Sequence, residues 1–98
     1  MCMLDRVREK REEIYAIARR NHAEKVWLFG SCARREERPE SDVDFLVDFE
    51  SNATLFDHAG LEYELAELLS HKVDVVAQKA ITSGTRFAQE VEKERIAV

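Results

Sequence analysis

The chain has 98 residues, 45% of them hydrophobic and 36% charged, and its formal net charge is −5. This length allows one domain with a small core, so we expect residues 1–98 to form a single domain. The hydrophobic content argues against intrinsic disorder, and the acidic balance argues against bulk attraction to DNA or RNA. No apolar run approaches the roughly 18 residues of a membrane span.

The N-terminal residues and the two cysteines favour a cytoplasmic protein. Acidic and basic residues alternate at the start of the chain, without the apolar stretch of a secretory signal. Cys2 and Cys32 lack the spacing of a metal site or of a disulfide framework. Reduced cysteines fit a reducing compartment, so we expect a cytoplasmic location.

Residues 4–20 begin a regular alternation of helices and strands. Their apolar side chains recur at the spacing of a helix. The wholly apolar run 26–29, closed by Gly30, is typical of a buried strand. A short helix is predicted over residues 32–37, ended by Pro39.

Residues 41–49 alternate in polarity, which predicts a strand with two different faces. One face carries only apolar side chains: Val43, Phe45, Val47 and Phe49. The other face is mostly acidic: Asp42, Asp44, Leu46 and Asp48. The two faces are therefore expected to have different roles.

The second half of the chain continues the alternation. Residues 55–69 have a broad apolar face at helical spacing, made of Leu55, Phe56, Ala59, Tyr63, Leu65, Ala66, Leu68 and Leu69. Residues 73–77 predict a third strand, and residues 82–96 a last helix with three inward side chains, Phe87, Ala88 and Val91. The order α-β-α-β-α-β-α predicts a two-layer α/β fold, with about four helices on a small mixed three-stranded sheet.

The turn Gly30–Ser31 lies between the first strand and the following predicted helix. Free backbone N–H groups at a helix start attract phosphate oxygens, and glycine lets a ligand approach the backbone closely. Serine is also a common N-cap without any ligand. By itself, this turn is better explained as an ordinary N-cap without a ligand.

Three aspartates lie on the two later strands. Asp42 and Asp44 are two residues apart, so both carboxylates lie on one face of a strand, about 7 Å apart. A divalent metal would offset their repulsion, and a solvated polar face on an edge strand is the alternative. Asp74 is a single charge in an apolar strand, where it needs a partner or a metal unless it lies at a strand end or sheet edge.

The combination of motifs is more specific than its parts. Gly-Ser, followed after ten residues by Asp-x-Asp, matches by chance about once in 10³ chains of this length. Residues 29–34 and 41–47 resemble the motifs of the minimal nucleotidyltransferases, the smallest members of the DNA polymerase β-like nucleotidyltransferase superfamily. Residues 73–76 are similar to the strand that carries their third carboxylate, and the resemblance extends over residues 4–98.

The resemblance implies a two-metal transferase site. Asp42, Asp44 and Asp74 would be the catalytic carboxylates and would hold two Mg²⁺ ions, with Mn²⁺ as an alternative. Gly30 and Ser31 would bind the β- and γ-phosphates of ATP. This assignment agrees with the chemistry, because two metals about 3.5–4 Å apart stabilise both the attacking and the leaving oxygen of a phosphoryl displacement.

Other polar side chains lie beside these motifs. Arg34 is expected to reach the phosphates as well, with a solvated arginine on a surface helix as the alternative. Lys72 and Lys79 flank the third strand, where they could meet a triphosphate or be ordinary surface lysines. Cys32 is expected to be a small packing residue rather than a nucleophile.

The resemblance also implies a protein substrate. Minimal nucleotidyltransferases are similar to the antitoxin halves of two-gene modules whose other half is a HEPN-domain ribonuclease, and transfer of AMP from ATP to a tyrosine silences that toxin. We expect this activity and a stable hetero-complex with such a toxin. Two alternatives stay open: an antitoxin that neutralises its partner by contact, and a nucleotidyltransferase acting on a small molecule or RNA.

Overall fold

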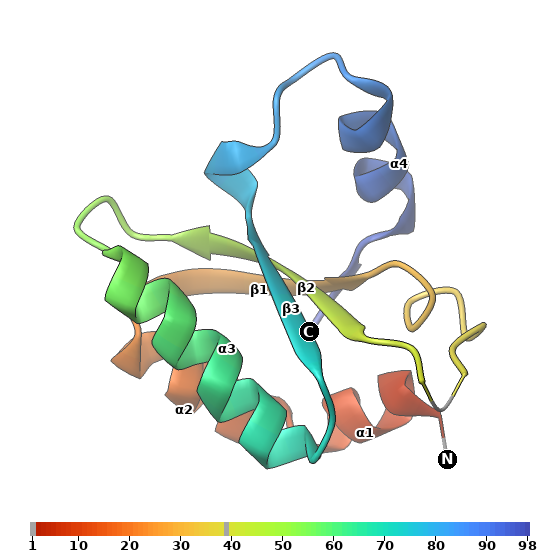
Figure 1. Cartoon of the computed structure of the whole chain (residues 1–98), viewed down its shortest axis with the longest axis horizontal. Helices are drawn as coiled ribbons and strands as arrows, with labels where there is room; N and C mark the ends of the chain where they lie inside the picture. The colour runs from red at the N-terminus through yellow and green to blue at the C-terminus, as the bar shows by residue number, and fades with distance from the viewer. Residues whose placement is uncertain (1, 39) are drawn as a thin grey trace.

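The computed structural model describes residues 2–38 and 40–98, and shows a mixed four-stranded sheet in the order β3-β2-β1-β4. Helices α1, α2 and α3 cover one face of the sheet and α4 covers the other (Figure 1). The elements are α1 (Met3–Glu9), α2 (Arg11–Arg20), β1 (Ala23–Phe29), β2 (Val43–Phe49), α3 (Leu55–Leu69), β3 (Val73–Ala77), the 3-10 helix η1 (Gln78–Ala80), α4 (Arg86–Glu94) and β4 (Ile96–Ala97).

The sheet confirms the predicted mixed α/β fold and corrects its strand count. Strands β1 and β2 are antiparallel, and α3 then carries the chain across so that β3 runs parallel to β2. The fourth strand, β4, pairs with β1 through only two residues. The sequence pattern missed it because the predicted last helix was extended to Ile96, whereas α4 ends at Glu94.

Strand β2 lies in the middle of the sheet and has two faces of different character. The face predicted to be wholly apolar joins the main core beneath α1, α2 and α3. The opposite face carries Leu46, which packs with Phe29 and Val91 in a much smaller cluster beneath α4. The alternation that predicted two different faces is therefore confirmed.

Three of the predicted helices have different bounds in the structure. Residues 4–20 form two helices instead of one, because Lys10 leaves the helical conformation at φ −100° and ψ 19°. The short helix predicted over 32–37 is instead a set of turns, with Arg35 at a φ of 60°. Its predicted end at Pro39 lies outside the described residues. The last helix starts at Arg86, capped by the Thr85 side chain, rather than at residue 82.

Helix α3 has the predicted bounds, but a different set of side chains faces the core. Thr54 and Asp57 form a capping box at its start. The fully buried side chains are Leu61, Leu65 and Leu69. Of the apolar face predicted from the sequence, Leu55, Phe56 and Tyr63 are 86%, 89% and 67% exposed. The predicted face was too broad, because the first turn of α3 presents Leu55 and Phe56 to solvent and Tyr63 lies on the exposed side of the helix further along.

Substitutions at the start of α3 should hardly affect stability. Replacing both Leu55 and Phe56 by serine is expected to change the free energy of unfolding by less than about 0.5 kcal/mol per site, because both side chains are already exposed. The buried control Leu65→Ala should cost about 2–5 kcal/mol. Urea denaturation measures both. A loss above about 1 kcal/mol per site in the serine variant would show that these side chains pack in solution.

In the described part of the chain, no helix combines the length and the apolar character that crossing a membrane requires.

Candidate active site

The turn after β1 brings the backbone directly against β2. Gly30 has a φ of +74°, a conformation that favours glycine. A Cβ atom at this position would lie 2.7 Å from the Oδ2 atom of Asp44, which is closer than side-chain contacts allow. Ser31 follows within the turns that span residues 30–35. The Gly-Ser motif and the Asp-x-Asp motif are therefore in contact.

Strand pairing places two of the three predicted aspartates side by side. Because β2 and β3 are parallel neighbours, Asp44 is the register partner of Asp74. On its other side, Asp44 faces Phe29, the last residue of β1. Asp44 is half-buried and Asp74 is exposed. This arrangement brings the glycine turn and two carboxylates together at one place on the sheet.

The surroundings of Asp44 disfavour its charged form. Burial raises the pKa of this carboxyl from 3.8 to about 6, and the negative charges of Asp74 and Asp42 act in the same direction. The Arg34 guanidinium lowers the pKa of Asp44, but by less. A group of carboxylates that repel each other in this way would be stabilised by a bound cation.

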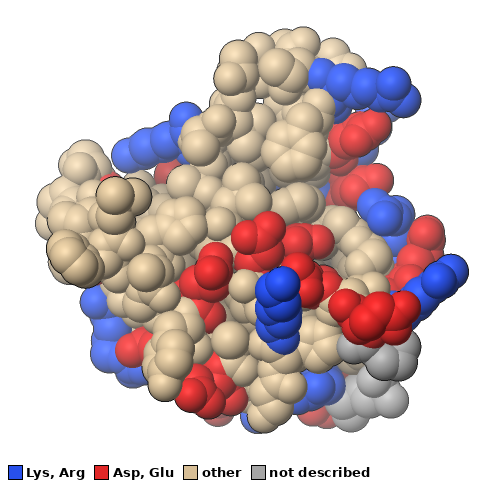
Figure 2. Space-filling model, viewed as in Figure 1, with Lys and Arg blue, Asp and Glu red and all other residues tan. Residues whose placement is uncertain are grey.

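Asp42 is close to Asp44 and Asp74, but its side chain pairs with a lysine. It precedes β2, and its Oδ2 atom lies 3.8 Å from the Nζ atom of Lys72. Within residues 2–38 and 40–98, no three His, Cys, Asp or Glu side chains are arranged so that they could hold a metal ion together. Figure 2 shows acidic side chains gathered near the middle of one face, with a basic side chain lying across them. The structure thus brings Asp44 and Asp74 together, with Asp42 turned towards Lys72.

The oxygen-rich donor set is of the kind that Mg²⁺ and Mn²⁺ prefer. The strand entry that carries Asp42 is fixed to the start of β3, because the Val43 N–H donates to the Lys72 carbonyl at 2.9 Å. The backbone is thus held, and the side chain of Asp42 is exposed enough to turn. The residues fit a divalent metal by chemistry, provided that Asp42 exchanges its contact with Lys72 for the metal.

Arg34 lies near the site but is bound by two acidic side chains. Its Nη1 atom is 2.7 Å from the Oε2 atom of Glu94 on α4, and its Nε atom is 3.6 Å from the Oε1 atom of Glu36. Neither of these partners was predicted from the sequence. Glu94 lies sixty residues further along the chain, so no local pattern could have indicated this contact. A phosphate would have to compete with these two carboxylates for Arg34.

Cys32 is buried beneath the turn and is not set up as a nucleophile. Burial raises the pKa of its thiol to about 11, and the negative charges of Glu37 and Asp44 act in the same direction. The thiolate is the reactive form, and little of it is present near neutral pH at such a pKa. This agrees with the predicted packing role.

The two cysteines should differ sharply in reactivity. With Ellman's reagent at pH 8, the native chain is expected to react quickly at the half-buried Cys2 and slowly at Cys32, whereas both react quickly in denaturant. A Cys32→Ala variant should retain the fast phase unchanged. Two equally fast thiols in the native chain would contradict the burial of Cys32.

A model of the nucleotidyltransferase domain family matches residues 4–98. The chain belongs to the nucleotidyltransferase family. The predicted resemblance and the prediction of a nucleotidyltransferase enzyme are thereby confirmed.

Two sequence relatives are named as protein adenylyltransferases. A candidate protein adenylyltransferase of Methanocaldococcus jannaschii is 36% identical over 75 residues, which are 76% of this chain and 81% of that protein. The protein adenylyltransferase MntA of Thermococcus cleftensis is 42% identical over 59 residues, 60% of each chain. The matched segment thus spans less than two thirds of the Thermococcus protein.

Solved structures share the fold of this nucleotidyltransferase. A structure described as a candidate minimal nucleotidyltransferase has a TM-score of 0.85 at 39% identity, and the match covers 100% of this chain and 97% of that one. A chain from the complex of tri-AMPylated Shewanella oneidensis HEPN toxin with MNT antitoxin has a TM-score of 0.66 at 22% identity. The match covers 92% of this chain and 69% of that one. At this lower identity, the second likeness concerns the fold alone.

Proposed function

We propose that this nucleotidyltransferase transfers AMP from ATP to a tyrosine hydroxyl of a HEPN-domain toxin, and so acts as the antitoxin of a toxin–antitoxin pair in the cytoplasm. The observation that carries the proposal is the contact between the Gly30 turn and the Asp44–Asp74 pair. Phosphate binding and carboxylate chemistry are needed side by side in nucleotidyl transfer. The names of the sequence relatives and the HEPN complex with the same fold support the choice of acceptor.

The proposed phosphate site is the turn after β1. The backbone N–H groups around Gly30 and Ser31 would donate to the β- and γ-phosphate oxygens, since glycine leaves the backbone accessible. Arg34 would add a positive charge on leaving Glu94. Asp42, Asp44 and Asp74 would hold two Mg²⁺ or Mn²⁺ ions, which lower the pKa of the attacking hydroxyl and stabilise charge on the transferring phosphate.

The proposed reaction is a single displacement at the α-phosphorus. The tyrosine oxygen forms a bond to the α-phosphorus, the bond from that phosphorus to the bridging oxygen breaks, and pyrophosphate leaves. Asp74 is the exposed carboxylate of the pair, so it is the one that would accept the proton of the hydroxyl. The turn and the strands supply position and electrostatic stabilisation, which account for most of the rate in such reactions.

One observation favours a second candidate function. As the side chains stand, the Asp42 carboxylate pairs with Lys72, with 3.8 Å between its Oδ2 atom and the Nζ atom. A protein of this fold that has lost catalysis would neutralise its toxin by contact alone. In that case, Asp44→Asn would leave protection of the host cell unchanged.

The test uses ATP labelled at the α-phosphate. We expect Mg²⁺, this protein and the HEPN protein encoded beside it to give labelled HEPN protein on a denaturing gel. The label should be lost with Asp44→Asn and retained with Asp48→Asn, a matched change further along β2. No label in the presence of an intact complex would reject catalysis and favour the contact antitoxin. Label on an added RNA or aminoglycoside instead would assign a different acceptor.

A further inference from the structure

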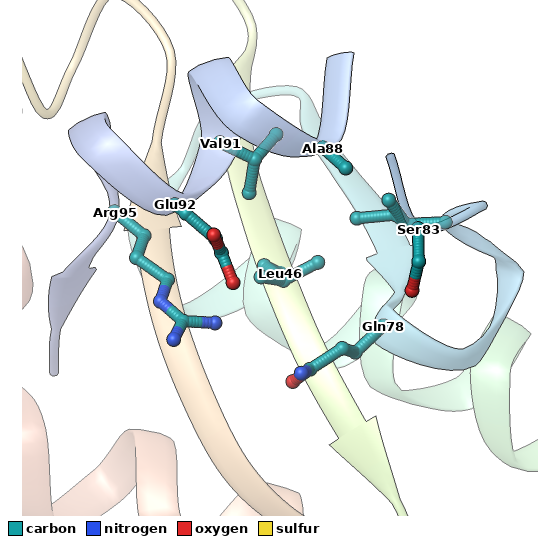
Figure 3. Close-up of a pocket in the computed structure, with 8 residues that line it drawn as sticks. Leu46, Gln78, Ser83, Ala88, Val91, Glu92 and Arg95 are labelled. Atoms are coloured by element: carbon teal, nitrogen blue, oxygen red, sulfur yellow. The ribbon is translucent and has the colours of Figure 1, made fainter. Parts of the chain in front are cut away.

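The three proposed carboxylates are not fixed equally well. Asp44 lies within β2, which pairs with a strand on each side, and Leu46 further along this strand packs with Val91 of α4 (Figure 3). Asp42 precedes β2, and the pairing with β3 begins only after it, at Val43. A metal ligand has to be held within about 0.5 Å of its working position. Contacts other than strand pairing must therefore position Asp42.

The loop between α3 and β3 supplies such contacts. The Nε2 atom of His71 is hydrogen-bonded to the carbonyl oxygen of Ser41, directly before Asp42. Because a carbonyl oxygen only accepts, the imidazole is the donor and its Nε2 atom carries the proton. On the other side of Asp42, the Val43 N–H donates to the Lys72 carbonyl at 2.9 Å. The loop therefore binds the backbone both before and after Asp42.

His71 is itself held by the end of α3. Ser70, which caps this helix, has a left-handed φ of 50°, and the His71 N–H donates back to the Ala66 carbonyl at 3.2 Å. The Nη2 atom of Arg6 donates to the Leu69 carbonyl at 2.6 Å, which ties the same helix end to α1. A half-buried imidazole on a fixed backbone has little conformational freedom to lose when it binds a carbonyl.

Further contacts support the same backbone from the other side. The Ser41 N–H donates to the Arg38 carbonyl at 2.9 Å, and the Ser41 Oγ atom accepts from the Arg38 N–H at 3.0 Å. The thiol of Cys32 lies against the next carbonyl, with 3.9 Å between its Sγ atom and the Asp42 oxygen. None of these contacts uses the Asp42 carboxylate, which pairs loosely with Lys72 and can still turn.

We propose that His71 is a positioning residue, which holds Asp42 where its carboxylate can turn from Lys72 to the metal. The inference rests on the proposed function and adds to its metal site a residue that acts through the backbone of Ser41. Without the imidazole, the strand entry would be less fixed, and Asp42 would have to be ordered again whenever a metal binds. The cost of that ordering would be measured as a weaker metal affinity.

The test measures Mn²⁺ binding to the protein alone, from the electron paramagnetic resonance signal of the free ion. His71→Ala should bind Mn²⁺ about 10-fold more weakly than the wild type, as expected for a residue that orients a metal ligand. His71→Gln should stay within about threefold of the wild type, because its Nε2 atom can donate in place of the imidazole. The matched control His22→Ala removes a histidine that contacts Asp57 at the opposite end of β1 from Gly30, and should leave the affinity unchanged.

A double-mutant cycle shows whether His71 acts through Asp42. Asp42→Asn should itself weaken Mn²⁺ binding, and adding His71→Ala to it should cause no further loss. A purely structural role would add the same loss in both backgrounds. His71→Leu, which fills the space of the imidazole without a donor, gives the same comparison if His71→Ala does not fold.

Three results would overturn the inference. The first is an unchanged Mn²⁺ affinity in His71→Ala or His71→Leu, and the second is a loss that is as large in the Asp42→Asn background as in the wild type. The third is a wild type that binds no Mn²⁺. The outcomes are separate from those of the proposed function. A loss that acts through Asp42 without AMP transfer rejects only the reaction, and transfer with an unchanged Mn²⁺ affinity rejects only the role of His71.

Discussion

The Asp44→Asn variant should lose AMP transfer by about 10³-fold or more and yet unfold at a higher temperature than the wild type. The loss follows from the position of Asp44 between the Gly30 turn and Asp74, where it would hold the proposed metal beside the proposed phosphate site. The gain follows from the repulsion and burial that raise the pKa of Asp44 to about 6. Asparagine keeps the size of the side chain and removes the buried charge.

The gain in stability depends on pH in a defined direction. The pKa of Asp44 is raised from 3.8 to about 6 in the folded chain. Between these two values, the folded chain binds more protons than the unfolded chain, so the wild type loses stability as the pH rises from about 4 to about 6. With allowance for solvent at this half-buried site, the loss is about 1–2 kcal/mol. The Asp44→Asn variant should not lose this stability, because asparagine does not titrate.

Thermal unfolding in EDTA, at pH 4 and at pH 7.5, measures this effect. We expect similar Tm values for wild type and variant at pH 4, and a Tm for Asp44→Asn that is several degrees higher at pH 7.5. Adding Mg²⁺ should raise the Tm of the wild type more than that of the variant. A variant that is less stable at pH 7.5, or that keeps a tenth of the transfer rate, would contradict this account of the site.

The Gly30→Ala variant should lose both stability and activity. Its φ of +74° costs an alanine about 1 kcal/mol or more. In addition, the new Cβ atom would lie 2.7 Å from the Asp44 Oδ2 atom, so the carboxylate or the turn has to move. A displacement of about 1 Å at a reacting centre lowers the rate by about 10²-fold. We expect a loss of that order in labelled-AMP transfer.

Gly84 offers a matched control for the cost of placing an alanine in a backbone conformation with positive φ. It has a φ of +81°, and a Cβ atom there would meet no atom within 4 Å. Gly84→Ala should therefore lower the free energy of unfolding by about 1 kcal/mol and leave the transfer rate unchanged. If the two alanine variants lose equal amounts of activity, the contact between Gly30 and Asp44 is not the cause.

The part of the fold governed by local pattern was predictable from the sequence. Alternation along residues 43–49 assigned each side chain of β2 to its face, because a central strand between two packed layers has a strict period of two. The bounds of α3 and β3 also agree, since polar residues clearly separate these elements. The Gly30 and Asp44 motifs were found by spacing, and the structure brings them into contact.

The remaining features depend on contacts between distant residues. The turns at residues 31–35 are fixed by the left-handed Arg35 and by its contact with Asp5, which no helical pattern records. Glu94 lies beside Arg34 because β4, which follows α4, pairs with β1. The exposure of Phe56 depends on how far α3 extends beyond the sheet, and the spacing of apolar residues along the helix does not indicate this.

The two faces of the sheet are covered by layers of very unequal strength. The main core beneath α1, α2 and α3 unites most of the buried side chains, whereas α4 is held through a cluster with three buried members, Phe29, Leu46 and Val91. Local opening requires little free energy where few apolar contacts are broken. We therefore expect the α4 layer to open at a lower free energy than the layer of α1, α2 and α3. Amide protons of α4 should then exchange with solvent sooner than those of β2, which native-state hydrogen exchange would measure.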